Sequence, residues 1–467
     1  MLKVTNLRLK YPNGYRKIFD NLNIEIKDKE KVLLLGPSGS GKSTLLNVLS
    51  GIVPNLIELP MKYDELQINQ HNGVIFQDPD SQFCMPKVYE ELAFVLENRQ
   101  VPRQDMDEAI SQALASVNLN VNENTQINQL SGGMKQKLAI VETILQQADT
   151  LFLDEPTAML DVNATSDLWQ RLIKLWKDQT VLIVEHKVEH IWQHVDRVLL
   201  MNYEGQIIAD DTPNHILKHY EHLLSEYGVW HPNAWHYAPE PKYMAPSSEA
   251  PLFKFENGAV IRNKKDLFKV DQLAIHSGEW ITITGQNGTG KTSLLESILQ
   301  LIKYKGVMTF QGQELRKIKD AAKHMYLVYQ NPELQFITNS VYDEILIHFN
   351  HLDSSIAESK TLDLLDLLDL TNVKNQHPYE LSMGQKRRLS VATALSSNAD
   401  IILLDEPTFG LDSHNTFQLI KLFQERVSKG QSIIMVTHDP EIIKRYPTRQ
   451  WIIENQYLTE IKGDQHV

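Results

Sequence analysis

Two short segments of the chain carry the residue types that hold phosphate groups. One reads GPSGSGKST and consists of Gly36, Pro37, Ser38, Gly39, Ser40, Gly41, Lys42, Ser43 and Thr44. The other reads GQNGTGKTS and consists of Gly285, Gln286, Asn287, Gly288, Thr289, Gly290, Lys291, Thr292 and Ser293. The backbone N–H groups of such a loop point at phosphate oxygens, and the lysine neutralises the β and γ phosphates. We therefore expect a nucleotide at each loop, with Mg²⁺ on the hydroxyls of Ser43 and Thr292.

Two acidic pairs follow at a distance, each at the end of an apolar run. TLFLDE ends in Asp154 and Glu155, and DIILLDE ends in Asp405 and Glu406. A buried strand delivers carboxylates in this way to a site at its carboxyl end. We expect Asp154 and Asp405 to hold the magnesium shell, and Glu155 and Glu406 to polarise the water that attacks the γ-phosphate.

The motifs of the first half recur in the second half in the same order. FQDPDSQF is matched by YQNPELQF, LSGGMKQK by LSMGQKRR, and VEHK by THDP. Each partner follows its counterpart by about 250 residues, which is the signature of a duplication. The chain therefore contains two related functional units.

The elements that position these motifs are predicted from the runs on either side. KVLLLG before the first loop is short and apolar, whereas STLLNVLSG after Lys42 has helical apolar spacing. The glycines thus lie at a strand-to-helix turn, which predicts an α/β fold. We expect domains at 1–224 and 252–467, joined by a linker at 225–251 where Pro, Trp, His and Tyr interrupt any periodicity.

Composition limits the classes of function. The chain has 467 residues and is 42% hydrophobic and 22% charged, which is ordinary for globular domains. No run approaches the roughly 18 to 20 apolar residues of a membrane helix, so we expect a cytosolic chain. One cysteine, Cys84, excludes an internal disulfide. The net charge of −13 disfavours a protein that mainly grips nucleic acid.

The chain resembles the ABC ATPase family, and the specific marker is LSGG before a helix. The resemblance implies two tandem nucleotide-binding domains, each with a P-loop core, an antiparallel β subdomain and a helical signature subdomain. It also implies that the two domains close head to tail around two ATP molecules. Ser382 and Gly384 would then complete the site of Lys42, and Ser131 and Gly133 that of Lys291.

Further roles come from the same resemblance. Gln77 and Gln330 match the Q-loop glutamines that touch magnesium, and His186 and His438 match the switch histidine. Asp161 and Asp412 match the aspartate that couples the two sites. Tyr11, 25 residues before Gly36, matches the aromatic that stacks on adenine.

The chain also departs from the family pattern. Counting back 25 residues from Gly285 reaches Val260, so the second adenine platform is lost or is supplied by Phe253 or Phe255. Met134 and Met383 replace residues of the LSGGQ consensus. We predict two hydrolysis-competent sites of unequal rate.

The segments after the Q-loop glutamines resemble those of energy-coupling factor (ECF) importers. There, a short helix carrying the positions of Gln82, Phe83, Gln335 and Phe336 seats the coupling helices of a membrane scaffold. The resemblance implies an ATPase at the inner face of the cell membrane, an integral-membrane scaffold subunit and a separate substrate-capture subunit. Within that group, the chain resembles the fused ATPases associated with import of thiamine or its hydroxymethylpyrimidine precursor.

Three other classes are weighed against this one. Ribosome-associated ABC factors are also tandem, but they carry a long basic linker, whereas residues 225–251 are short and include Glu226, Glu240 and Glu249. Sugar-importer double ATPases lack the QDPxxQF form. DNA-repair clamps would show a coiled-coil insertion or zinc cysteines.

Overall fold

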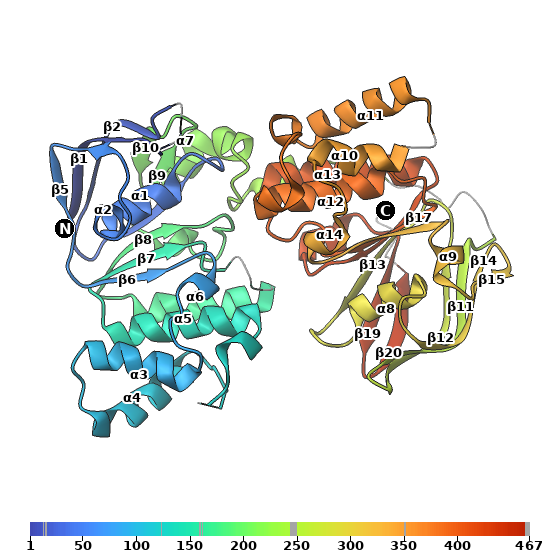
Figure 1. Cartoon of the computed structure of the whole chain (residues 1–467), viewed down its shortest axis with the longest axis horizontal. Coiled ribbons are helices and arrows are strands. Elements are labelled where there is room, and N and C mark those ends of the chain that lie inside the picture. Colours follow the sequence, from blue (N-terminus) through green and yellow to red (C-terminus); the bar gives the residue numbers. More distant parts are fainter. Residues whose placement is uncertain are drawn as a thin grey trace. The chain divides into compact units, whose positions relative to one another are not determined.

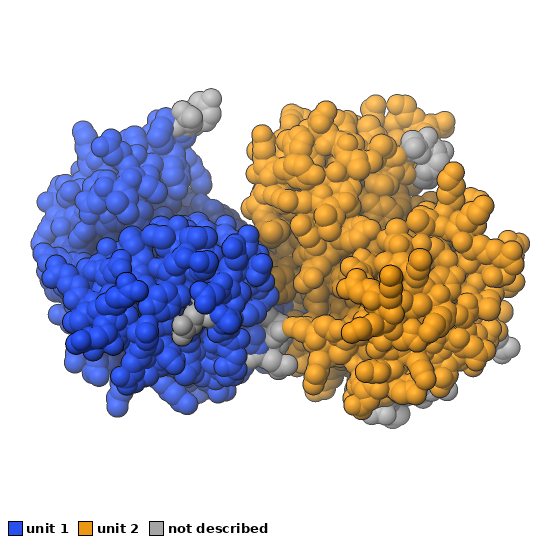
Figure 2. Space-filling model, turned by 60° about the horizontal axis from the view of Figure 1, so that its bottom comes forward, with its two compact units in different colours: residues 1–237, 412–414 blue, residues 238–411, 415–467 orange. Residues whose placement is uncertain are grey.

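The computed structural model describes residues 1–12, 14, 16–122, 124–157, 160, 162–242, 250–349 and 352–462. The chain forms two compact units: residues 1–237 with 412–414, and residues 238–411 with 415–467 (Figure 2). The segment suggested as a linker starts within a helix of unit 1, and Trp230 and His231 in it are buried. Unit 1 therefore extends to Tyr237.

The core sheet of unit 1 has the strand order β10-β9-β3-β8-β7-β6, and all its neighbours are parallel except β10 and β9. Its strands are β3 (Lys31–Leu35), β6 (Asn72–Ile75), β7 (Thr150–Asp154), β8 (Thr180–Val184), β9 (Arg197–Met201) and β10 (Ile207–Asp211). Every residue of β7 and β8 is buried, as in a parallel sheet covered on both faces. The acidic pair Asp154 and Glu155 therefore stands at the carboxyl edge of a central strand.

A second, antiparallel sheet completes the β structure of unit 1. It consists of β1 (Leu2–Leu9), β2 (Phe19–Ile26), β4 (Met61–Lys62) and β5 (Glu65–Gln67), with β1 pairing the other three. Buried and exposed side chains alternate along much of β2, as expected for a sheet with one face on a core.

The helices of unit 1 are α1 (Lys42–Leu49), α2 (Ile52–Asn55), α3 (Val88–Asn98), α4 (Arg103–Ser116), α5 (Gly132–Gln146), α6 (Val162–Leu175) and α7 (Pro213–Glu226). Short 3₁₀ turns are η1 (Pro79–Ser81), η2 (Ile127–Gln129), η3 (Trp192–His194) and η4 (Ala234–Tyr237). Helices α3, α4 and α5 pack on one another and form a separate helical group (Figure 1). The predicted helical signature subdomain is this group.

Unit 2 repeats the same parts in one continuous sheet with the order β15-β14-β11-β12-β20-β19-β13-β18-β17-β16. Its strands are β11 (Phe253–Arg262), β12 (Lys265–Ile275), β13 (Trp280–Gly285), β14 (Tyr304–Phe310), β15 (Gln313–Glu314), β16 (Met325–Val328), β17 (Ile401–Asp405), β18 (Ser432–Val436), β19 (Arg449–Glu454) and β20 (Tyr457–Lys462). A parallel contact between β12 and β20 joins the antiparallel part to the core part.

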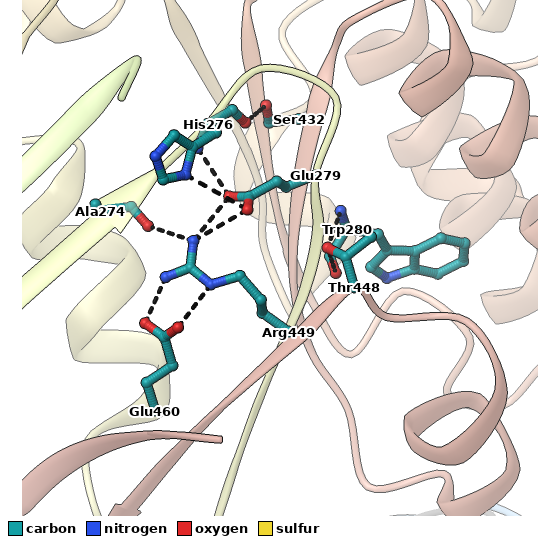
Figure 3. Close-up of polar contacts among 8 residues, drawn as sticks. All are labelled: Ala274, His276, Glu279, Trp280, Ser432, Thr448, Arg449 and Glu460. Atoms are coloured by element: carbon teal, nitrogen blue, oxygen red, sulfur yellow. Dashed lines mark hydrogen bonds and ion pairs between the residues drawn. The ribbon is translucent and has the colours of Figure 1, made fainter. Parts of the chain in front are cut away.

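One arginine fastens these two parts of the unit 2 sheet together. Arg449 Nη1 donates to the Ala274 carbonyl oxygen at 3.0 Å and to Glu279 Oε2 at 2.9 Å, and its Nε donates to Glu460 Oε1 at 2.9 Å (Figure 3). Arg197 fills the same place in unit 1, where its Nη1 donates to the Glu25 carbonyl at 2.9 Å. Both arginines are partly buried, and carboxylates balance their charge: Glu279 and Glu460 beside Arg449, and Glu30 and Asp210 beside Arg197.

The helices of unit 2 are α8 (Lys291–Ile298), α9 (Ile318–Ala321), α10 (Val341–Leu346), α11 (Ser354–Leu367), α12 (Met383–Ser396), α13 (Ser413–Ser428) and α14 (Pro440–Arg445). Five of them follow the order of unit 1, since α8, α10, α11, α12 and α13 stand where α1, α3, α4, α5 and α6 do. The 3₁₀ turns are η5 (Pro332–Gln335), η6 (Ile347–Phe349), η7 (Thr371–Val373) and η8 (Pro378–Glu380). The predicted fold class is confirmed in each half. Among the helices described, none is both long and apolar enough to span a membrane.

Candidate ATP sites

Each glycine-rich loop lies between a core strand and a helix, as predicted. In unit 1 the loop links β3 to α1, and Gly36 has a φ of 152°. A Cβ at Gly36 would stand 2.5 Å from the Met201 carbonyl oxygen, so only glycine fits. Lys42 Nζ reaches back and donates to the carbonyl oxygens of Gly36 and Pro37, both at 2.9 Å. The ammonium group is therefore held inside the loop, where phosphates would meet it.

The loop of unit 2 has the same geometry. Lys291 Nζ donates to the carbonyl oxygens of Gly285 at 2.8 Å and Gln286 at 3.1 Å. Thr289 Oγ1 donates to the same Gln286 carbonyl at 2.9 Å. Helix α8 begins at Lys291, so its amino-terminal N–H groups face the loop.

A hydroxyl and a carboxylate meet beside each loop. Ser43 Oγ donates to Asp154 Oδ1 at 3.0 Å, and Thr292 Oγ1 donates to Asp405 Oδ2 at 2.7 Å. Burial raises the pKa of the Asp154 carboxyl to about 6 and raises that of Asp405 as well. Oxygen ligands of this kind suit Mg²⁺, and a dication would stabilise the charged carboxylates. The chemistry of the pairs Ser43–Asp154 and Thr292–Asp405 therefore fits the ion.

The two glutamates after these aspartates adopt a left-handed backbone. The φ of Glu155 is 48° and that of Glu406 is 51°. Each amide N–H donates to the end of the neighbouring strand, at Val184 and at Val436. A left-handed residue other than glycine costs free energy, of order 1 kcal/mol, and such residues cluster at functional sites. The two predicted catalytic glutamates thus share the same unusual backbone conformation.

The surroundings of the two glutamates differ. His186 Nε2 lies 2.8 Å from Glu155 Oε1, and the Gln77 side-chain amide donates to Glu155 Oε2. Burial opposes ionisation of Glu155, but the hydrogen bond and charge of His186, with the charge of Lys42 and the hydrogen bond from Gln77, together lower the pKa of the carboxyl. Glu155 is therefore ionised, and His186 and Gln77 hold its two carboxyl oxygens in place.

The carboxyl of Glu406 lies farther from its histidine side chain. His438 Nε2 lies 3.6 Å from Glu406 Oε1, and within the described part of the chain this oxygen accepts no hydrogen bond. Burial, with the adjacent charge of Asp405, raises the pKa of Glu406 to about 8. The two predicted catalytic glutamates thus lie in different protonation environments.

A further acidic residue of unit 1 lies inside the VEHK motif, but the motif gave it no role. Glu185 precedes the switch histidine and is buried, with its Oε2 accepting from Thr157 Oγ1 at 2.9 Å. Burial raises the pKa of Glu185 to about 7. Its counterpart in the THDP motif is Thr437, so a comparison of the two repeats would have revealed the difference.

The signature residues lie at the amino termini of α5 and α12. Ser382 Oγ accepts from Gln385 N at 3.4 Å while Gln385 Oε1 accepts from Ser382 N at 3.0 Å, which closes a capping box. Ser131 caps α5, where Met134 replaces the glutamine and closes no such box. Gly133 and Gly384 lie in the first turns of these helices. The pairing of each signature with the opposite P-loop stays a prediction.

The remaining predicted residues are placed as follows. The Gln330 backbone carbonyl accepts from Arg387 Nη2 at 2.6 Å. Asp412 belongs to unit 1, and Asp161 lies outside the described residues. Tyr11, 43% exposed, shares a hydrogen bond of 2.7 Å with Thr44 Oγ1 beside the first loop.

The residues considered for the second adenine platform are core residues. Val260, Phe253 and Phe255 have no exposed surface. All three belong to the core cluster under the unit 2 sheet. None of them can meet a nucleotide base, so those alternatives are wrong.

The fold and the two sites define a P-loop ATPase with two tandem nucleotide-binding domains. A family model described as ABC transporter matches residues 19–158 and 268–409. A Bacillus subtilis (strain 168) protein, provisionally named HMP/thiamine import ATP-binding protein YkoD, is 33% identical over 96% of this chain and 88% of its own length. A provisionally named ABC transporter ATP-binding protein of Clostridium perfringens (strain 13 / Type A), CPE1583, is 30% identical over 93% of this chain and 86% of its own. The chain therefore belongs to the ABC transporter family, and it is an ATP-binding ATPase.

Solved structures show the same fold. The archaeal ribosome recycling factor aABCE1, in its complex with ribosomal stalk protein aP1, has a TM-score of 0.69 at 21% identity. The match covers 98% of this chain and 90% of that one. At this identity the likeness concerns the architecture of tandem ATPase domains.

Proposed function

We propose that the chain is the ATP-hydrolysing subunit of an ECF-type membrane importer for a vitamin or vitamin precursor. The hydroxymethylpyrimidine/thiamine group is the first substrate class to test, because the relative from Bacillus subtilis bears that name and aligns over nearly the whole chain. The chain would act at the inner face of the cell membrane with an integral scaffold subunit and a separate substrate-capture subunit.

The residues of each site divide the work of ATP hydrolysis. Lys42 and Lys291 neutralise the phosphates, and the loop amides hold them in place. Ser43 with Asp154, and Thr292 with Asp405, would hold Mg²⁺, which supplies charge stabilisation on the phosphates. Glu155 and Glu406 orient the attacking water, and His186 keeps Glu155 in its ionised form.

The observation that carries the proposal is the segment after each Q-loop glutamine. In unit 2 this segment contains η5 and leaves Leu334 69% exposed and Ile337 74% exposed. The matching positions of unit 1 are Ser81 and Cys84, which are exposed too. Apolar side chains exposed next to a nucleotide site are typical of a contact surface for another protein.

The exposed segment is joined firmly to the signature helix. In unit 2, Gln335 Nε2 donates to Thr393 Oγ1 at 2.8 Å, and Lys386 Nζ pairs with Glu333 Oε1 at 2.5 Å. In unit 1, Lys135 Nζ pairs with Asp80 Oδ1 at 2.6 Å. A movement of the helical group would therefore carry the contact surface with it.

The opposite edge of each segment is fixed by a buried glutamate. Glu344 Oε2 accepts from the amides of Ile337 at 3.0 Å and Thr338 at 2.8 Å. Glu91 Oε2 accepts from the amides of Cys84 at 2.9 Å and Met85 at 2.6 Å. We refer to Glu91 and Glu344 as the loop clamps.

A ribosome-associated ATPase is the competing function, and it shares this fold. The net charge of −13 argues against it, because binding to RNA requires cations that neutralise phosphates. The importer is favoured by the sequence relatives, which are named as transporter ATPases.

Affinity purification from membranes with mass spectrometry of the retained proteins tests the proposal. We expect one polytopic scaffold protein and one small membrane protein. The double variant Leu334→Glu, Ile337→Glu should lose both while keeping ATPase turnover in detergent-free solution. Ile461→Glu, a 50% exposed position on β20, is the matched control and should retain them. Recovery of ribosomal proteins instead would refute the importer.

A further inference from the structure

The strand registers show which residue of unit 2 occupies the place of Tyr11. In unit 1, Leu9 pairs with Phe19 across the β1–β2 hairpin, and Tyr11 follows two residues later. In unit 2, Val260 pairs with Phe268 across the β11–β12 hairpin, and Arg262 follows two residues later. We infer that Arg262 is the platform on which the nucleotide base stacks in the second site.

Contacts with the P-loop helices agree with this correspondence. Tyr11 Oη lies 2.7 Å from Thr44 Oγ1, and Thr44 is the second residue after the loop lysine. Arg262 Nη1 lies 3.5 Å from Ser293 Oγ, and Ser293 is the second residue after Lys291. Both side chains therefore stand at the same helix turn beside their own phosphate loop.

The exposure of the two side chains is also similar. Tyr11 is 43% exposed, and the Arg262 side chain is 48% exposed. A residue that stacks on a base must offer an open surface beside the loop. Arg262 does so, whereas Val260, Phe253 and Phe255 are enclosed.

A second difference between the halves accompanies the arginine. Arg262 Nη1 forms an ion pair with Glu296 Oε2 on α8, and the matching residue on α1 is Asn47. The carboxylate holds one nitrogen of the guanidinium and balances its charge. Tyr11 needs no such partner. The pair Arg262–Glu296 thus replaces an aromatic ring with a planar cation held in place.

A guanidinium is planar and stacks on aromatic rings through cation–π and dispersion attraction. Arg262 would therefore bind the base by its flat face, as an aromatic platform does, and favour purines over the smaller pyrimidines. This inference rests on the assignment of the loop at Lys291 as a nucleotide site.

Single-site backgrounds test the inference. In Lys42→Ala, nucleotide binding reports the site of Lys291; in Lys291→Ala, it reports the site of Lys42. We expect Arg262→Ala to lower the affinity for ATP about tenfold in the Lys42→Ala background and to leave it unchanged in the Lys291→Ala background. Tyr11→Ala should show the reverse pattern. Arg262→Tyr should restore ATP affinity to within about twofold, because a ring can replace the guanidinium as a platform.

Inorganic tripolyphosphate separates base stacking from a general effect of charge. It carries the phosphates without a base, so its affinity should be the same in the Lys42→Ala parent and in that parent with Arg262→Ala. An equal loss for ATP and tripolyphosphate, or an unchanged ATP affinity, would overturn the inference. If neither ligand binds the Lys42→Ala parent, the nucleotide site itself is wrong. Glu296→Gln, with a thermal unfolding midpoint for each variant, controls for loss of the ion pair.

Discussion

Gln82 Nε2 donates to Glu142 Oε2 at 2.6 Å and so joins the segment after the first Q-loop glutamine to the signature helix α5. In unit 2 the same bond runs from Gln335 to Thr393. The acceptor is a carboxyl oxygen in unit 1 and a hydroxyl oxygen in unit 2. The hydrogen bond itself is therefore present in both units, although the acceptor group differs. The carboxylate brings a pH dependence that threonine does not.

Glu142 should make the stability of the chain fall with rising pH. Burial raises its pKa from 4.5 to about 8, so between these values the folded chain retains a proton that the unfolded chain releases. The free energy of unfolding therefore decreases through this window and levels off above it. Glu142→Gln should raise stability at pH 8 relative to the parent by about 1–3 kcal/mol, with little change at pH 4.5. Thermal unfolding at both pH values checks this, and equal pH slopes in parent and variant would contradict it.

Replacing the two predicted catalytic glutamates should have unequal effects. Glu155 is ionised and held by His186, whereas the pKa of Glu406 is about 8 and His438 lies farther away. We expect Glu155→Gln to lower ATP turnover about 100-fold and Glu406→Gln less than about tenfold. Steady-state phosphate release measures both. Equal losses would show that the two sites turn over alike.

The switch histidine of unit 1 should set the pH profile of hydrolysis. His186→Ala removes the hydrogen bond and charge that lower the pKa of Glu155, and burial then raises that pKa. The acid limb of the turnover profile should move to higher pH. His438→Ala, where the separation from glutamate is 3.6 Å, should shift the profile less. If His186→Ala lowers ATP turnover equally at every pH, without moving the acid limb, then His186 does not control the ionisation of Glu155.

Cys84 offers a direct probe of the proposed membrane contact. It is the only cysteine of the sequence, it is exposed, and it directly follows the QDPDSQF motif, in the segment after the first Q-loop glutamine. We call this segment and its counterpart in unit 2 the contact segments. A maleimide should label it readily in the isolated chain and at least about tenfold more slowly in a purified complex with its membrane partners. A Cys84→Ser, Ser116→Cys variant moves the thiol to the end of α4 as a control. Equal labelling of Cys84 in both states would place the contact elsewhere.

The sequence was sufficient where chemistry depends on contiguous residues. The P-loops, the acidic pairs and the switch histidines follow from local patterns, because a strand, a turn and a helix bring them together. The α/β fold with its antiparallel and helical parts was also predictable. The head-to-tail pairing of the domains stays a prediction.

Counting residues along the chain gave the wrong position for the second adenine platform. Counting back from Gly285 reached Val260 because the count assumed hairpins of equal length. The β11–β12 hairpin has only Asn263 and Lys264 between its strands, both at positive φ, whereas β1 and β2 are separated by residues 10–18. Register across a hairpin, which no motif records, identifies Arg262. The pair of Gln82 and Glu142 was missed for a similar reason, since its partners are far apart in sequence.

The loop clamps have a mechanical consequence. With Glu91 and Glu344 binding the amides on one edge, and the signature helices holding the other, the contact segments have little compliance of their own. We therefore expect that a displacement of helices α10 and α12 would carry Leu334 and Ile337 with it. If a partner binds at these residues, the distance that it moves would depend on the rotation of these helices. Weakening a clamp would then reduce that distance without slowing ATP turnover.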